Sequence, residues 1–267
     1  MFELLALVAA CLTVTAIYAG ELKLRERDLG RRLVPPGFES PMRRVVAATI
    51  LAFGLWIVVF LPMIPSDEPI DFETLSPWLI FFAHGMSFIV LGLWCVLAGY
   101  DQEGSLLETL GLKAGDPWGE VGVGMRVGVV VWGLVLAASV VFGLVMMLFG
   151  GGEMVTGEPA PEIVWIAGLP IGFRILLSLS AGVVEEIFFR GFLQPRIGLW
   201  ASTALFVMAH VGYGQLVLVF AVTLLSLVYG ELTRRRGNVW AAVAAHALFD
   251  AVQLLIVIPW TLSSAGG

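Results

Sequence analysis

The sequence predicts an all-α polytopic membrane protein, a bundle of about eight transmembrane helices. Three observations predict this fold class. Of the 267 residues, 59% are hydrophobic and 13% are charged, with a mean hydropathy of +0.94, more apolar than a soluble domain needs to fill its core. Several apolar runs have a length of about 20 residues, which is the length of helix that crosses a bilayer. Charged residues gather mainly in the loops between these runs, and two of the loops are acidic without any Lys or Arg.

The composition also limits the class of partner. A net charge of −6 and an isoelectric point near 5.1 exclude nucleic acid as a partner, because a phosphate-binding surface needs clustered basic residues. The two cysteines, Cys11 and Cys95, both lie in apolar runs, so we expect no disulfide framework and no cysteine metal site. The lipid bilayer is therefore the first partner that the sequence predicts.

The first three predicted spans are separated by one basic and one acidic loop. Basic residues follow the span at 2–18, whereas a signal peptide carries them before its apolar region, so we expect a retained anchor with the N-terminus outside. The second span is predicted at 45–64. The loop at 65–76 has four acidic residues and no Lys or Arg, which places it outside, and the third span follows at 78–98.

The middle of the chain holds one long span between two polar loops. The loop at 100–120 returns on the inside, and its segment 106–113 is typical of a short amphipathic surface helix that ends near Gly111. The fourth span, 121–149, is long enough to tilt. The following loop, 150–162, carries three glutamates and no basic residue, so we place it outside.

The last third of the chain is an apolar stretch divided by short breaks. The run from residue 163 is interrupted at 168–172, where a Gly-Leu-Pro-Ile-Gly segment should break the helix. The remaining predicted spans are 173–193, 199–211, 216–232 and 239–262, with a turn at 212–214. The last span ends outside, so we expect both termini outside a multi-pass protein of the plasma (cytoplasmic) membrane.

Three charged residues in these spans cost the most free energy to place inside a membrane: Glu185, Glu186 and Arg190. A charged side chain at the centre of a membrane helix costs roughly 3 kcal/mol even on lenient scales, so such groups usually face the bundle interior and serve a function. Glu186 and Arg190 are four residues apart and can pair on one helix face. Glu185 lies about 100° round the helix and needs a partner on another helix. All three are candidate catalytic residues.

Two histidines on later spans lie at a depth that matches Glu185. Glu185 lies eleven residues before Arg196, His210 fourteen residues after Arg196, and His246 ten residues after Arg236. At about 1.5 Å per helical residue, the three groups sit roughly 15 to 21 Å from the same membrane face. We therefore expect them to meet inside the bundle.

The residues that converge at this depth suit hydrolysis. Asp250 shares a helix face with His246, and Phe206 shares one with His210. Burial makes a carboxylate more basic, so a glutamate there can take a proton from water near neutral pH. Imidazoles can orient that water or stabilise an oxyanion. His84 has no acidic neighbour at helical spacing, and we expect it to be structural.

The same residues could hold a metal ion. Glu185, His210 and His246 are candidate ligands, since two imidazoles and one carboxylate are a sufficient set for a catalytic zinc. However, no His-Glu-x-x-His helix is present, and each histidine comes from a separate span. We therefore expect water activation without a cofactor, and zinc is the alternative.

Three motifs follow one another on the late spans: Glu185-Glu186-x-x-x-Arg190, Phe206-x-x-x-His210 and His246-x-x-x-Asp250. In this order they resemble the motifs of the CAAX prenyl protease and bacteriocin-processing (CPBP, or abortive-infection-like) intramembrane peptidases. The resemblance covers about residues 163–262, and the first four spans carry no motif. It implies an eight-helix fold with an intramembrane cavity that faces the cytoplasm.

The resemblance also implies roles for these residues. It makes Glu185 the activator of water together with His210, and it places His246 and residue 250 on the oxyanion side. An ionised Asp250 cannot donate a hydrogen bond, so it must be protonated or must act by orienting His246. Phe206, one turn before His210, is a candidate substrate contact.

The sequence thus predicts an intramembrane endopeptidase of the CAAX protease-like type. Its expected partners are the bilayer and a peptide or protein substrate at the membrane, with lipidated, CAAX-like peptides as one class. We expect one membrane domain over 1–267, with the catalytic core helices in 163–262. The alternatives are a proton-coupled transporter that uses the same Glu and His groups, and a non-catalytic scaffold or immunity protein with the same fold.

Overall fold

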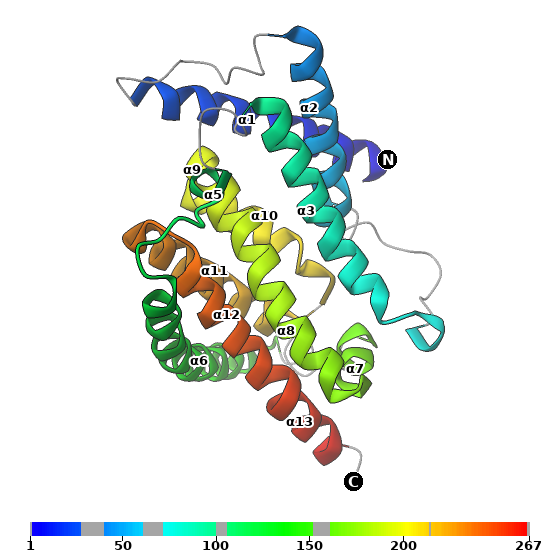
Figure 1. Cartoon of the computed structure of the whole chain (residues 1–267). Helices are drawn as coiled ribbons and strands as arrows, with labels where there is room; N and C mark the ends of the chain where they lie inside the picture. The colour runs from blue at the N-terminus through cyan, green and yellow to red at the C-terminus, as the bar shows by residue number, and fades with distance from the viewer. Residues whose placement is uncertain are drawn as a thin grey trace.

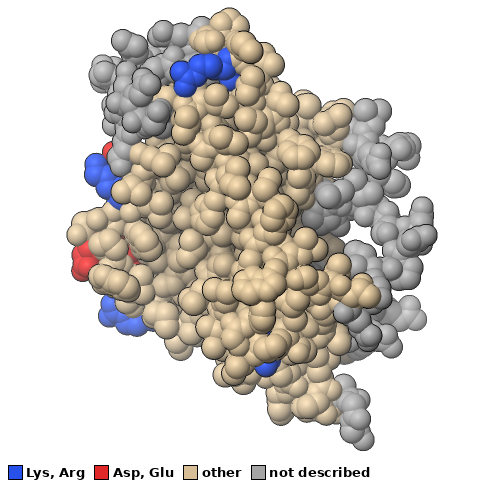
Figure 2. Space-filling model, turned by 45° about the vertical axis from the view of Figure 1, so that its right-hand side comes forward, with Lys and Arg blue, Asp and Glu red and all other residues tan. Residues whose placement is uncertain are grey.

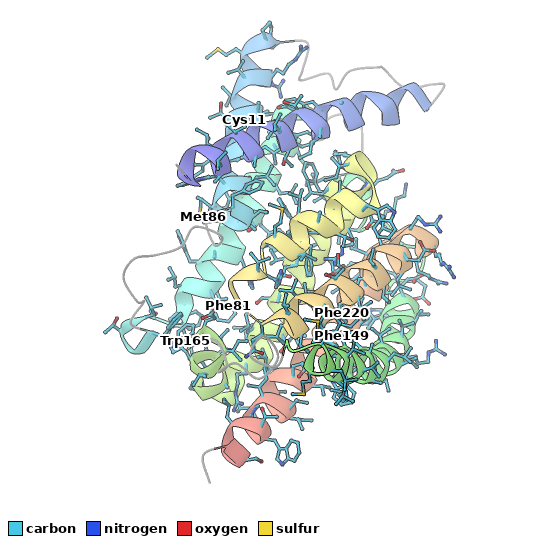
Figure 3. The ribbon with its side chains drawn as sticks, turned by 180° about the vertical axis from the view of Figure 1, so that it is seen from behind. Cys11, Phe81, Met86, Phe149, Trp165 and Phe220 are labelled. Carbon is cyan, nitrogen blue, oxygen red and sulfur yellow. The ribbon has the colours of Figure 1, made fainter. Side chains whose placement is uncertain are left out.

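A computed structural model describes most of the chain. The described residues are 2–27, 40–60, 72–99, 106–151, 161–213 and 215–265. Within these ranges the chain is a bundle of helices without strands, and α1 (Phe2–Arg27) lies across one end of it (Figure 1, Figure 3). Much of the two acidic loops, predicted at 65–76 and 150–162, and Gly214 of the predicted turn lie outside the described residues.

The N-terminal half contains the first three predicted spans. They form α1, then α2 (Pro41–Leu55) with a π-helical continuation at Trp56–Phe60, and then α3 (Trp78–Ala98). Ser40 begins α2, because its Oγ accepts a hydrogen bond from the Arg43 amide at 3.5 Å. Pro41 occupies the first turn, where a missing N–H is tolerated. The bounds of α3 are those predicted.

The predicted surface helix is present, and it is attached to the bundle. α5 (Leu106–Thr109) is followed by Gly111, whose φ of +69° favours glycine. The Gly111 carbonyl accepts a hydrogen bond from the Val239 amide at 2.9 Å, and Trp240 Nε1 donates to the Leu112 carbonyl at 2.8 Å. These bonds tie the segment to the start of the last long helix, besides any contact it makes with lipid.

The long fourth span is α6 (Pro117–Leu148). Asp116 begins it, since its Oδ1 accepts a hydrogen bond from the Gly119 amide at 2.9 Å. The break predicted at 168–172 is confirmed next: α7 (Pro161–Gly168) ends there, and α8 (Ile171–Glu185) begins directly after Pro170.

α8 continues without interruption as a π-helix, η6 (Glu186–Leu193), which the sequence did not predict. The elements that follow are α9 (Gln194–Ile197), α10 (Leu199–Met208), a 3-10 turn at Val211–Tyr213, α11 (Leu216–Arg236), α12 (Trp240–Val252), a π-helical turn at Gln253–Val257 and α13 (Ile258–Ala265). The last predicted span therefore forms one continuous helical rod from α12 to α13 (Figure 1).

α12 is the central helix of this half, because it packs against α6, α8 and α11. Small residues allow the close approach. A Cβ added at Gly128 of α6 would lie 3.1 Å from Ala245 Cα of α12. One added at Gly182 of α8 would lie 3.0 Å from the Ala247 nitrogen. These contacts bring the backbone that carries His246 beside the backbone that carries Glu185.

The helix lengths and compositions are those of an integral membrane protein. Five described helices are long and apolar enough to cross a bilayer: Pro41–Phe60, Trp78–Ala98, Pro117–Leu148, Leu216–Arg236 and Trp240–Ser264. In the view of Figure 2 the charged side chains gather at the top and along the left edge, and most of the remaining described face is uncharged. The all-α polytopic fold is confirmed, whereas the number of about eight spans stays a prediction.

Candidate active site

The motif Glu185-Glu186-x-x-x-Arg190 lies where α8 becomes the π-helix η6. π-Helical turns inside α-helices are frequent at functional sites. Glu186 and Arg190 form the predicted ion pair, with Oε1 and Nη1 3.0 Å apart, and their side chains are 0% and 1% exposed. Removing either partner of a pair this deeply buried would destabilise the protein, because the remaining charge would be buried without a counter-charge.

His246 of α12 completes a buried chain of charged groups. Its Nδ1 lies 2.8 Å from Glu186 Oε1, and since a carboxylate oxygen accepts, Nδ1 is the donor. Its Nε2 lies 3.4 Å from Asp250 Oδ2. The Tyr229 ring stacks on the imidazole with 5.4 Å between centroids. His246 is thus held between two carboxylates, and the glutamate it contacts is Glu186, whereas the depth argument paired it with Glu185.

Glu185 instead faces His210 of the short segment after α10. His210 Nε2 lies 3.7 Å from Glu185 Oε2, and the two side chains are 16% and 21% exposed. His210 Nδ1 lies 2.7 Å from the Phe206 carbonyl and must donate to it, because a carbonyl oxygen only accepts. This bond fixes the ring so that Nε2 faces the carboxylate. The pair is the more accessible part of the site.

Phe206 forms the packing layer between the two pairs. Its side chain is 3% exposed, and the Arg190 Cζ atom lies 4.0 Å from its ring centroid, as in a cation–π contact. The His210 ring lies 4.5 Å away and the His246 ring 6.2 Å away, between centroids. The ring is almost fully buried and also packs against the Phe189 ring, 5.0 Å away between centroids. A contact of Phe206 with substrate stays a prediction.

His84 of α3, expected to be structural, contacts α8, the helix that ends at Glu185, and the sequence did not predict this contact. Its Nδ1 lies 3.0 Å from Ser180 Oγ on α8. The sequence argument compared His84 only with residues on its own helix. The signal that could have found it is its position in a span, since a histidine in a membrane helix usually faces the bundle interior.

The side chains as placed do not form a three-ligand metal site. Among the residues that the structure describes, no group of three His, Cys, Asp or Glu side chains could hold a metal ion. Of the candidate zinc ligands, Glu185 and His210 face each other, whereas both nitrogens of His246 face carboxylates of Glu186 and Asp250.

Comparisons with known proteins find similarity over the same segment. Residues 167–252 match the family model described as type II CAAX prenyl endopeptidase Rce1-like. An uncharacterized protein of Bacillus subtilis (strain 168), YpbD, is 37% identical over 79 residues, which are 29% of this chain and 42% of that relative's length. No solved structure matches. The matched residues include all three motifs, so this segment is similar to the Rce1-like family of type II CAAX prenyl endopeptidases, and the chain spans less than half the length of the curated relative it matches.

Proposed function

We propose that this protein is a membrane-embedded endopeptidase in which Glu185 and His210 activate water for attack on a peptide bond. The observation that carries the proposal is the pair of atoms Glu185 Oε2 and His210 Nε2, which face each other 3.7 Å apart. The separation is too long for a direct hydrogen bond. It suits a small bridging molecule that contacts both atoms.

Water is the molecule that fits this pair. Because His210 Nδ1 donates its hydrogen to the Phe206 carbonyl, Nε2 of the neutral ring is an acceptor, as is the Glu185 carboxylate. A water molecule about 2.8 Å from each atom can donate one hydrogen to each, since the two acceptors are closer than twice that distance. Its lone pairs then point away from the pair and toward a substrate.

The proton balance of the reaction follows from this geometry. The water oxygen attacks the carbonyl carbon of the scissile peptide bond, and Glu185 takes one of its protons as general base. The carbonyl oxygen becomes an oxyanion. When the C–N bond breaks, Glu185 returns the proton to the leaving nitrogen, which gives a carboxylic acid product and an amine. Glu185 is thereby ready for a second turnover.

The buried residues around the Glu186–Arg190 ion pair hold the Glu185–His210 pair in place. Arg190 neutralises Glu186, and Glu186 accepts the hydrogen bond from His246 Nδ1. Asp250 in turn faces His246 Nε2, so its role here is to orient the imidazole. Phe206 packs between Arg190 and His210. These residues fix the geometry, and Glu185 and His210 perform the proton transfer.

The helices around the site and the matched family support a class of substrate. His246 lies on a helix that could cross a bilayer, and this helix packs against two others of that kind, α6 and α11. The description of the matched family names CAAX prenyl endopeptidases. We therefore propose a membrane-associated or lipidated peptide as the substrate.

Purified protein should cleave members of a quenched lipopeptide library, and a chelator wash should leave the rate within about twofold. A rate that is lost with one bound zinc per chain and restored by zinc would contradict the metal-free mechanism.

Orientation is a further part of the proposal, with the site open to the cytoplasm and both termini outside. Ser263→Cys, in a background without Cys11 and Cys95, should react with a membrane-impermeant thiol reagent added to intact cells. Arg235→Cys should react only after the membrane is opened, because Arg235 belongs to the basic end of α11, which is expected inside. The reverse labelling would contradict the orientation.

A further inference from the structure

The contacts of His246 depend on the plane of its imidazole ring. Nδ1 lies 2.8 Å from Glu186 Oε1, and Nε2 lies 3.4 Å from Asp250 Oδ2. Both contacts require the ring to keep one orientation relative to α12. The χ2 torsion of a histidine is broad and roughly two-fold, so rotamer preference alone does not select this orientation. A neighbour packed against the face of the ring can select it.

Tyr229 of α11 is such a neighbour. Its ring stacks on the imidazole of His246, with 5.4 Å between centroids and 23° between planes. The same ring lies 6.0 Å from the Arg190 Cζ atom, at the edge of the cation–π range. Tyr229 is 1% exposed. The Phe206 ring also approaches His246, but it meets the imidazole edge-on, with 74° between planes. Tyr229 therefore supplies the flat contact.

Two buried hydrogen bonds hold this part of α11 against the elements that carry the other motifs. Ser226 Oγ donates to Thr203 Oγ1 of α10 at 3.0 Å. Gln194 Nε2, directly after η6, donates to the Gly230 carbonyl at 2.8 Å. Glycine allows this approach, since a Cβ added at Gly230 would lie 2.6 Å from Gln194 Oε1. Both bonds lie within one turn of Tyr229, so α10 and η6 help to place its ring.

The hydroxyl group of Tyr229 makes a weaker contact than the ring. Its Oη lies 3.4 Å from the Ala245 carbonyl, which is long for a hydrogen bond from a hydroxyl. The bond gives a buried O–H group a partner but does not touch the imidazole. The face of the ring is therefore the contact that can orient His246.

We propose that Tyr229 is a positioning residue, whose ring fixes the plane of the His246 imidazole. Through the hydrogen bond from His246 to Glu186 it also steadies the start of η6, where Glu185 is the preceding residue. The inference rests on the proposed peptidase function. It extends the site to α11, which carries none of the three motifs, and it assigns no proton transfer to the tyrosine.

Substitutions at Tyr229 separate the ring from the hydroxyl group. Tyr229→Phe keeps the stacked ring and should keep the wild-type kcat. Tyr229→Leu keeps a buried apolar side chain but removes the flat face, and kcat should fall by about 10²-fold, the cost of a small misplacement of catalytic groups. KM should change little, because the side chain is buried away from substrate. Steady-state cleavage of a quenched lipopeptide measures both constants.

Nuclear magnetic resonance of ring-labelled histidine reports the orientation of His246 separately from activity. The chain has three histidines, so the signals are few, and replacing one histidine at a time assigns them. The ring protons of a stacked imidazole are shielded by the aromatic face beside it. The His246 signals should therefore move downfield in Tyr229→Leu and stay in place in Tyr229→Phe.

Phe220→Leu is the matched control on the same helix. The Phe220 ring, labelled in Figure 3, stacks on Phe142 of α6 with 4.4 Å between centroids and 5° between planes. Its loss should lower the stability of the protein, because it also removes a stacked pair of rings. The kcat and the His246 signals should equal those of the wild type.

Gln194→Met is a second test, which decides the inference if Tyr229→Leu does not fold. It removes the hydrogen bond to the Gly230 carbonyl but keeps an unbranched side chain. The His246 signals should move in the same direction as in Tyr229→Leu, by a smaller amount, and kcat should fall. Unchanged signals together with an unchanged kcat would contradict the placement of Tyr229.

The remaining outcomes also decide the inference. A wild-type rate for folded Tyr229→Leu, in a protein that Glu185→Gln inactivates, would overturn the role of Tyr229 and leave the peptidase proposal standing. A slow Tyr229→Leu variant whose His246 signals do not move would show that Tyr229 acts by another route, which also overturns it. A Tyr229→Phe variant as slow as Tyr229→Leu would assign the effect to the hydroxyl group and contradict the inference. A wild-type protein that cleaves no lipopeptide would overturn the peptidase proposal and the positioning role together.

Discussion

Glu185→Gln is expected to lower kcat for peptide cleavage by about 10²- to 10⁴-fold, the range that a positioned general base contributes. The substitution keeps the shape of the side chain but removes its ability to take a proton from water. Because Glu185 is 21% exposed and its contact to His210 is 3.7 Å long, the fold should tolerate the change. Single-turnover cleavage of a quenched lipopeptide by purified protein measures the effect.

The control for this variant is Glu231→Gln on α11. Glu231 also contacts basic side chains, with Oε2 2.7 Å from Arg234 Nε and Oε1 2.6 Å from Arg235 Nε, but these arginines are exposed at the basic end of the helix. Its kcat should equal that of the wild type. A Glu185→Gln protein that is folded and cleaves at the wild-type rate would show that the base lies elsewhere.

Glu186→Gln is expected to lower the stability of the protein by about 3 to 5 kcal/mol, because it leaves the Arg190 charge buried without its partner. Both side chains are at most 1% exposed. The amide oxygen can still accept the hydrogen bond from His246 Nδ1, so the loss reports mainly on the ion pair. Equilibrium unfolding in detergent gives the change in free energy of unfolding.

A double variant separates the buried charge from the packing. Glu186→Gln with Arg190→Met removes both charges and should recover part of the lost stability, since an apolar replacement of a buried pair is often tolerated. The Glu231→Gln control should unfold with the wild type, because its ion pairs are exposed to solvent. A Glu186→Gln protein as stable as that control would contradict the account of the buried pair.

Local patterns predicted the elements of the fold well. The bounds of α3 follow from an apolar run with Pro77 before it and Gly99 after it. The end of the short helix near Gly111 and the break around Pro170 follow from residues whose backbone preferences are strong. The pairing of Glu186 with Arg190 followed from their spacing of four residues.

The contacts between distant elements could not be predicted in this way. The π-helix at Glu186–Leu193 was not predicted from the local sequence. Depth alone placed Glu185, His210 and His246 together but could not assign His246 to Glu186. The approach of His84 to Ser180 spans 96 residues and depends on how α3 packs against α8.

The central claim is that Glu185 and His210 act as one unit on one water molecule, and a double-mutant cycle on kcat tests it most directly. Glu185→Gln, His210→Ala and the double variant would be compared with the wild type on the same lipopeptide. Residues that act as a unit are strongly non-additive, so the double variant should be about as slow as the slower single variant. Two single effects that multiply in the double variant would show that the residues act independently and would contradict the account.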